Sequence, residues 1–191
     1  MRVTSFFYQA FRMSRTRHRG SSLLEVMVAI LILSFGLLGL GGLAAAAQRY
    51  VKMAQFQSIG TLMATDLGER MRGNINGFSK GLYVRANAYS TTAVELPTCA
   101  TPSACTSAEL AALDMAQWVG ELQKRLPGGD AHVKLDPANA LATDIWILWI
   151  DPKASKELSV ADASTDCPAA ALAGIADDAP KPRCMYYRIS L

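Results

Sequence analysis

Few side chains in this sequence could do chemistry, and the most reactive of them are histidines and cysteines. The two histidines, His18 and His132, are too few for most metal sites and most nucleophile–base pairs. No two of the four cysteines have the CxxC spacing typical of zinc sites. The sequence also lacks a glycine-rich phosphate loop. It therefore predicts no catalytic residue, no metal and no cofactor.

The four cysteines are better suited to forming disulfides. An even number of cysteines in an exported region favours two bridges, and four cysteines allow three pairings. Proximity in the sequence favours Cys99 with Cys105 and Cys167 with Cys184, without excluding the other pairings. Because disulfides persist in oxidising compartments, we expect this part of the chain to lie outside the cytoplasm.

An apolar block near the start of the sequence could bring about this export. Residues 26–47 form a run of 22 residues without a charge, which is long enough to span a bilayer. Residues 1–20 carry five arginines and no acid, and the remainder has 14 basic and 16 acidic residues. The basic segment is expected to stay in the cytoplasm. The acidic remainder argues against a nucleic-acid-binding domain, whose positive charge would lie on the folded part.

Glu25 lies at the start of this apolar block, where a carboxylate is costly. At membrane depth the cost is about 2.5 kcal/mol or more, so Glu25 either lies in the headgroup zone and helps to start a helix or has a partner. The apolar run is longer than the roughly 7–15 residues of a cleavable signal peptide. Residues 44–47, all alanine, could still mimic a cleavage site.

The string from His18 to Ile30 resembles the N-terminal signal of type IV pilins and type II secretion pseudopilins. The resemblance implies that a prepilin peptidase cuts after Gly20 and methylates the new amino terminus at Ser21, where most members have Phe. It also implies that the apolar helix is retained and that Glu25 neutralises the terminal amine of a neighbouring subunit. Such pairing makes a buried charge tolerable.

The apolar block continues into an amphipathic helix. Apolar residues recur at helical spacing from Met53 to Met71, no proline interrupts residues 21–72, and Gly73-Asn74 is typical of a helix end. The pattern predicts one helix of about 50 residues, roughly 75 Å long. The expected division of the chain is a cleaved leader (1–20), a membrane-spanning segment (21–47) and a periplasmic head (48–191).

A second helix is expected after a long loop of small and polar residues. Thr106 and Glu109 form a capping box, and Pro127-Gly128-Gly129 would end the helix. Asp114 and Trp118 share one face of it. We expect Trp118 in the core and Asp114 as the acceptor for a backbone or indole donor. The segment resembles the corresponding part of minor type IV pilins.

The last third of the sequence predicts strands. Apolar residues alternate around Val133 and over residues 186–191, whereas residues 145–150 are apolar on both faces. One face would pack on the long helix, and the other, through Trp146 or Trp149, is a candidate for contact with a partner. The expected fold is α+β, the type IV pilin fold, with a long N-terminal helix packed on a small antiparallel sheet and an extra helix.

The resemblance implies a structural role, as a minor type IV pilin of the complex that primes pilus assembly and forms the tip. The implied partners are prepilin peptidase, other minor pilins, the major pilin, the inner-membrane assembly platform, a tip adhesin and, before assembly, the lipid bilayer. The implied location is the inner membrane, single-pass with the C-terminus in the periplasm, and then the pilus. The alternative is a minor pseudopilin of a type II secretion or competence system. No enzyme activity and no nucleic-acid binding are expected.

Overall fold

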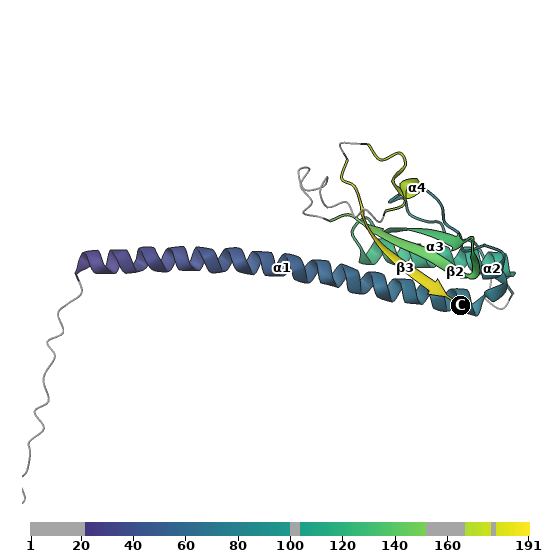
Figure 1. Cartoon of the computed structure of the whole chain (residues 1–191), viewed down its shortest axis with the longest axis horizontal. Coiled ribbons are helices and arrows are strands. Elements are labelled where there is room, and N and C mark those ends of the chain that lie inside the picture. Colours follow the sequence, from purple (N-terminus) through teal and green to yellow (C-terminus); the bar gives the residue numbers. More distant parts are fainter. Residues whose placement is uncertain (1–21, 100–103, 152–166, 177–178) are drawn as a thin grey trace, which may run out of the picture. The chain divides into compact units, whose positions relative to one another are not determined.

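The computed structural model describes residues 22–99, 104–151, 167–176 and 179–191 (Figure 1). The chain divides into two compact units, Met1–Arg49 and Tyr50–Leu191. The elements, in order, are α1 (Leu23–Gly73), α2 (Ile75–Ser79), α3 (Ser107–Arg125), β1 (Asp130–Asp136), β2 (Asn139–Trp149), α4 (Ala169–Leu172) and β3 (Arg183–Ser190). The 51 residues of α1 confirm the predicted helix of about 50 residues.

Within the first unit, α1 is apolar and exposed. Every residue from Leu23 to Ala47 is exposed to solvent. An 18-residue window of α1 has a mean hydropathy of 2.5 and no buried residue, so α1 is long and apolar enough to cross a membrane. An apolar surface of this extent is unfavourable in water and calls for lipid or another protein around it.

Within the second unit, one stripe of α1 is buried against the rest of the head. The buried residues recur at spacings of three and four: Gly60, Met63, Ala64, Leu67, Gly68 and Met71. The two glycines allow β3 to approach closely. A Cβ atom at Gly60 would lie 2.9 Å from the Tyr187 hydroxyl oxygen, and one at Gly68 would lie 3.0 Å from the Ile189 side chain. β3 therefore rests directly on α1.

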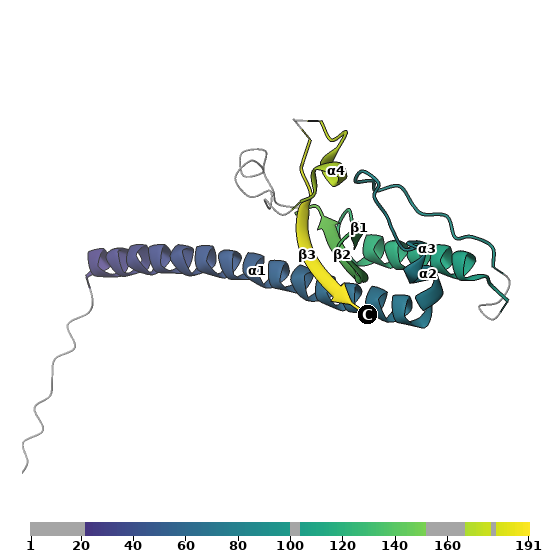
Figure 2. The ribbon, with the colours of Figure 1, turned by 45° about the vertical axis from the view of Figure 1, so that its right-hand side comes forward.

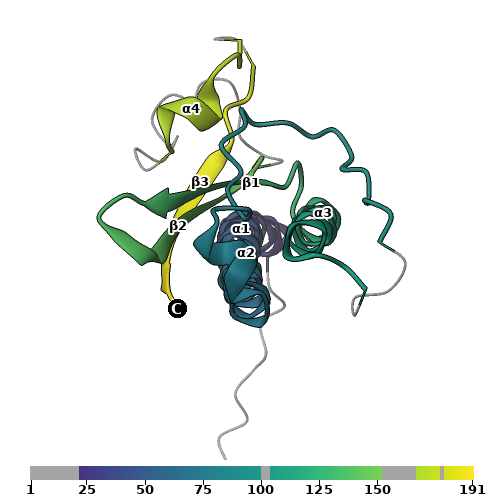
Figure 3. The same ribbon diagram turned by 90° about the vertical axis from the view of Figure 1, so that its right-hand side faces the viewer.

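The three strands form one antiparallel sheet in the order β1-β2-β3. In the central strand β2, the side chains of Ile145, Ile147 and Trp149 are buried in the core with residues of α1 and α3. Figure 3 shows α3 beside α1. This small antiparallel sheet, with a long N-terminal helix and further helices, is the α+β, pilin-like architecture predicted from the sequence.

The start of α3 has the predicted capping box. The Thr106 hydroxyl accepts a hydrogen bond from the Glu109 main-chain N–H at 3.3 Å, and the Glu109 carboxylate accepts one from the Thr106 N–H at 2.8 Å. Both interactions satisfy donors that the first turn of a helix leaves unpaired. The helix ends at Arg125, before Pro127, as the sequence predicts.

Candidate functional sites

Glu25 occupies the first turn of α1 and is exposed. The turn begins at Ser22, whose main-chain oxygen accepts from the Glu25 N–H at 2.9 Å. An acid here suits the positive end of a helix. In the described part of the chain Glu25 takes part in no ion pair, so its carboxylate is free to meet a charge on another molecule. Gly20 and Ser21, the predicted processing residues, lie outside the described residues.

Trp118 is the anchor of the head, as expected. Its side chain is completely buried, and its indole N–H donates to the main-chain oxygen of Met63 at 2.8 Å. This hydrogen bond joins α3 to α1 near the N-terminal end of the buried stripe. The ring supplies apolar contact, and the N–H fixes which turn of α1 it meets.

Asp114 has other partners than the sequence predicted. It accepts a hydrogen bond from the Tyr83 hydroxyl at 2.7 Å and forms an ion pair with Arg70 at 3.3 Å, and neither donor is a backbone or indole N–H. Trp118 already donates its indole N–H to α1, which leaves Asp114 to these two side chains. The Asp114–Arg70–Tyr83 group therefore ties α3 to α1 and to the loop after α2.

Burial, and next the hydrogen bond to Asp114, raise the pKa of Tyr83 well above its ordinary value of 10.0. The folded state keeps this phenol protonated at a pH where the unfolded chain releases the proton. Tyr83 therefore contributes stability that is complete below pH 10 and is lost as the pH rises above it. Above pH 10, Tyr83 should lower the free energy of unfolding by up to about 1.4 kcal/mol per pH unit.

Tyr83→Phe should consequently make the free energy of unfolding less dependent on pH above pH 10. The measurement is denaturant unfolding of the full chain in detergent, followed by circular dichroism. It is repeated from about pH 8 to about pH 11, the range in which an ordinary phenol titrates. Tyr50→Phe, at an exposed tyrosine of α1, is the matched control. An unchanged slope in Tyr83→Phe would refute the assignment.

A second polar group fastens the segment before α3 to the sheet. The Asp130 carboxylate is buried and accepts from the Arg85 guanidinium at 2.9 Å and from the Ser90 main-chain N–H at 2.9 Å. Arg85 also pairs with Val133 of β1 through the main chain. This group was not predicted from the sequence. The sequence feature that could have indicated this group is Asp130, an acid at the start of an apolar strand.

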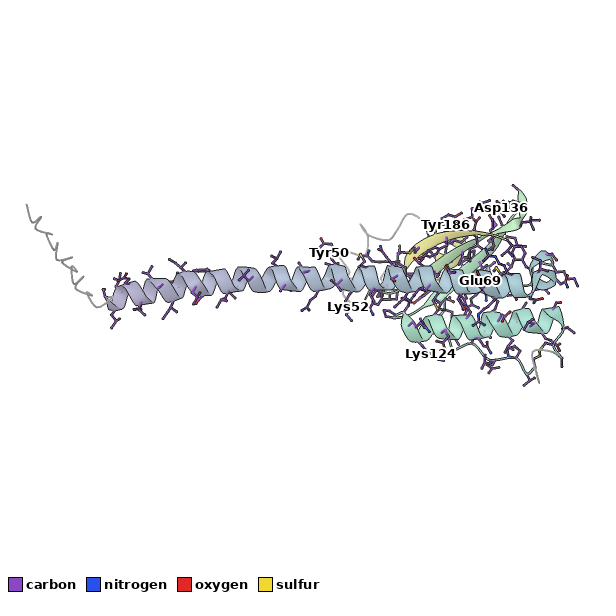
Figure 4. All side chains as sticks on the ribbon, turned by 90° about the horizontal axis from the view of Figure 1, so that it is seen from below. Tyr50, Lys52, Glu69, Lys124, Asp136 and Tyr186 are labelled. Atoms are coloured by element: carbon purple, nitrogen blue, oxygen red, sulfur yellow. A yellow bond between two sulfur atoms is a disulfide. The ribbon has the colours of Figure 1, made fainter. Side chains whose placement is uncertain are left out.

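The outer face of the sheet carries a row of aromatic rings. His132, Trp146 and Tyr186 are register neighbours across β1, β2 and β3, and the ring centroids of Trp146 and Tyr186 are 5.2 Å apart. Trp146 is half-buried, and Tyr186, which is labelled in Figure 4, is exposed. Trp149 belongs to the opposite face, is 4% exposed and lies in the core, so the expectation that it is a candidate for contact with a partner is wrong.

The structure contains two disulfides, Cys99–Cys105 and Cys167–Cys184. This is the pairing that proximity in the sequence favours. The second bridge joins the segment before α4 to β3, and Cys184 packs with Leu148 and Ala171 against the outer face of the sheet. The outer face is therefore covered near α4, whereas Tyr186 is exposed.

Within the described ranges, no group of three or more His, Cys, Asp or Glu side chains could hold a metal ion. The polar groups that the fold does assemble, around Asp114 and Asp130, join elements of the head to one another. These groups therefore hold the elements of the head together. Among the described residues, exposed groups that could interact with another molecule include Glu25, the apolar part of α1 and Tyr186 on the outer face of the sheet.

Comparison with known proteins finds the prokaryotic N-terminal methylation motif over residues 15–41. This range contains Gly20, Ser21 and Glu25, and most of the exposed apolar part of α1. No curated protein and no solved structure is found to match the chain. The motif supports a pilin or pseudopilin, with processing by prepilin peptidase and assembly of the pilus type. Together with the apolar helix, it fits a protein anchored in a membrane before assembly.

Proposed function

We propose that the chain is a minor type IV pilin, a structural subunit of the complex that primes pilus assembly and forms the pilus tip. The observation that carries the proposal is the methylation motif in register with Glu25, which lies in the first turn of an exposed apolar helix. In this proposal residues 1–20 are a cleaved leader, residues 21–47 span the inner membrane, and residues 48–191 form the periplasmic head.

The minor-pilin part of the proposal is supported by the segment around α3. It resembles the minor pilin PilV, the type IV pilus modification protein, in Cys105, Glu109, Asp114, Trp118 and Leu126-Pro127-Gly128-Gly129. In the head these residues form a disulfide, a capping box and the contacts of α3 with α1. The partners would be other minor pilins, the major pilin, the assembly platform and a tip adhesin.

The mechanism proposed for Glu25 is electrostatic. Before assembly the apolar part of α1 lies in lipid, and in the filament it lies among the same helices of neighbouring subunits, so its burial is kept. Glu25 would pair with the methylated amine at Ser21 of a neighbour. Two buried charges are tolerable when they pair with each other, and an unpaired charge opposes insertion.

The experiment is mass spectrometry of the N-terminal peptide, taken from the inner membrane and from filaments sheared off the cell surface. The proposal predicts an N-methylated Ser21 terminus in both fractions. The same terminus confined to the membrane would favour a pseudopilin of a type II secretion or competence system, whose signal is of the same kind. A peptide that begins at Met1 or near Gln48 would refute the processing.

A further inference from the structure

The outer edge of β1 is closed by another part of the head. Arg85 and Val133 exchange main-chain hydrogen bonds of 3.0 and 2.8 Å along this edge. The Asp130 carboxylate holds Arg85 and Ser90 beside the same strand. An open strand edge is a template for pairing with another chain, and covering it is a common protection. β1 is protected in this way.

At the other side of the sheet β3 is the last strand, and among the described residues no further strand pairs with its outer edge (Figure 2). The Leu191 N–H donates to the Leu141 oxygen at 2.9 Å, and the β2–β3 register continues from there without a bulge. Because main-chain groups alternate in direction along an antiparallel strand, those of Tyr186 and Arg188 point away from β2. In the part of the chain that the structure describes, no main-chain bond reaches these groups, whereas the outward Ser190 oxygen accepts from a side chain of α1.

The side chains at this edge are held on the outer face and do not screen it. Arg188 forms ion pairs with Asp136 and Asp144, and the Tyr186 hydroxyl donates to Asp144 at 2.6 Å. Charged side chains are one of the means by which an edge strand is protected from pairing. The guanidinium of Arg188 is instead drawn across the sheet to Asp136 and Asp144, away from the outward main-chain groups of Tyr186 and Arg188.

A shallow hollow of about 580 Å³ lies beside the start of β3. It is lined by Gln57, Trp146, Cys184, Met185 and Tyr186. Gln57 belongs to α1, so the helix forms one wall, and the room beside the edge suits one extended segment rather than a second sheet with its own helix. Met185 faces the core and α1, whereas Trp146 lies on the outer face and offers an apolar lining for one side chain of that segment.

We infer that β3 receives an extended segment of a different subunit of the assembly. The segment pairs with the outward main-chain groups of Tyr186 and Arg188 and places an apolar side chain against Trp146 on the outer face. Main-chain pairing supplies the attachment, and the hollow supplies the preference for an apolar residue. This inference rests on the proposed function and names the surface of the head through which the subunit meets its partner.

The test is hydrogen exchange of single amides, measured by mass spectrometry with electron-transfer fragmentation. The full processed chain is examined in detergent by itself and within isolated pilus assemblies. The Tyr186 and Arg188 amides should exchange at least about tenfold more slowly in the assembly, because pairing protects an amide from water. The Tyr187 amide, which points toward β2, is the internal control and should exchange alike in both samples.

Two variants distinguish the contribution of the main-chain N–H of Tyr186 from that of its side chain. Tyr186→Pro removes the outward N–H and leaves the bonds to β2 in place, since proline is tolerated at an edge strand. Tyr186→Val removes the ring and keeps the N–H. Both should keep the circular dichroism of the head, and the proline variant should be lost from assemblies while the valine variant is retained. Equal retention of the two variants would overturn the inference.

The remaining outcomes separate this inference from the proposed function. A chain that enters assemblies with Tyr186 and Arg188 amides as fast as in detergent overturns the inference and leaves the proposed function standing. Protection that grows with concentration in the purified chain identifies a second copy as the occupant and also overturns it. A chain that never leaves the membrane in an assembly refutes the proposed function and the inference together.

Discussion

Glu25→Gln is expected to leave cleavage after Gly20 intact and to lower the share of the chain found in sheared filaments by about tenfold or more. Glu25 is exposed in the first turn of α1, and no ion pair within the described residues engages it. Removing one charge of a buried pair costs about 3–5 kcal/mol, and about 1.4 kcal/mol already corresponds to tenfold. Quantitative mass spectrometry of the membrane and filament fractions measures the effect.

The matched control is Glu69→Gln on the same helix. Glu69 is an exposed residue of the head whose ion pair is with Arg72, and exposed pairs of this kind contribute little to stability. This variant should assemble like the wild type. If Glu25→Gln also assembles normally, the proposed pairing with a neighbouring amine is wrong.

Trp118→Ala is expected to lower the free energy of unfolding of the head by about 3–5 kcal/mol. The side chain is completely buried between α3 and α1, so truncation leaves a cavity and removes the hydrogen bond to Met63. Trp118→Phe keeps a ring but loses the N–H, and should cost about 1–3 kcal/mol. Denaturant unfolding of the full chain in detergent, followed by circular dichroism, measures both variants.

Leu62→Ala provides the comparison for this prediction. Leu62 precedes Met63 on α1 but is exposed, and substitutions at such sites usually change stability by about 0.5 kcal/mol or less. A loss in Trp118→Ala as small as that in Leu62→Ala would show that the contact between α3 and α1 contributes little to the stability of the head.

Local patterns were sufficient to predict most elements of the fold. The helical spacing of Met63, Leu67 and Met71 located the buried stripe of α1, and Thr106 with Glu109 located the start of α3. Capping and periodicity depend on residues within a few positions of one another, so a single sequence contains them. The methylation motif is equally local, which is why the candidate signal was recognisable.

The faces of β2 were not predictable in the same way. From Ile145 to Ile150 every residue is apolar, so the alternation that normally marks the buried face is missing. Trp146 and Trp149 were therefore both candidates for a partner surface. The register with β1 and β3 and the contacts with the helices decide which is buried, and Trp149 lies on the core face.

Contacts between residues far apart in the sequence could not be predicted either. Asp114 meets Tyr83 and Arg70, which are 31 and 44 positions away, and nothing in the spacing connects them. The position of β3 as the last strand depends on the order of the three strands and on the segment that closes β1. Such pairings follow from tertiary packing, which one sequence without relatives does not display.

The glycines of α1 are of two kinds, and the difference makes four of them useful as reporters. Gly60 and Gly68 are fully explained by the approach of β3. A methyl group at Gly36, Gly39, Gly41 or Gly42 would meet nothing within 4 Å in the described residues, and alanine there should favour the helix by about 1 kcal/mol each. An alanine at one of these four positions that impairs assembly would therefore expose a demand made by neighbouring molecules, because the isolated chain makes none.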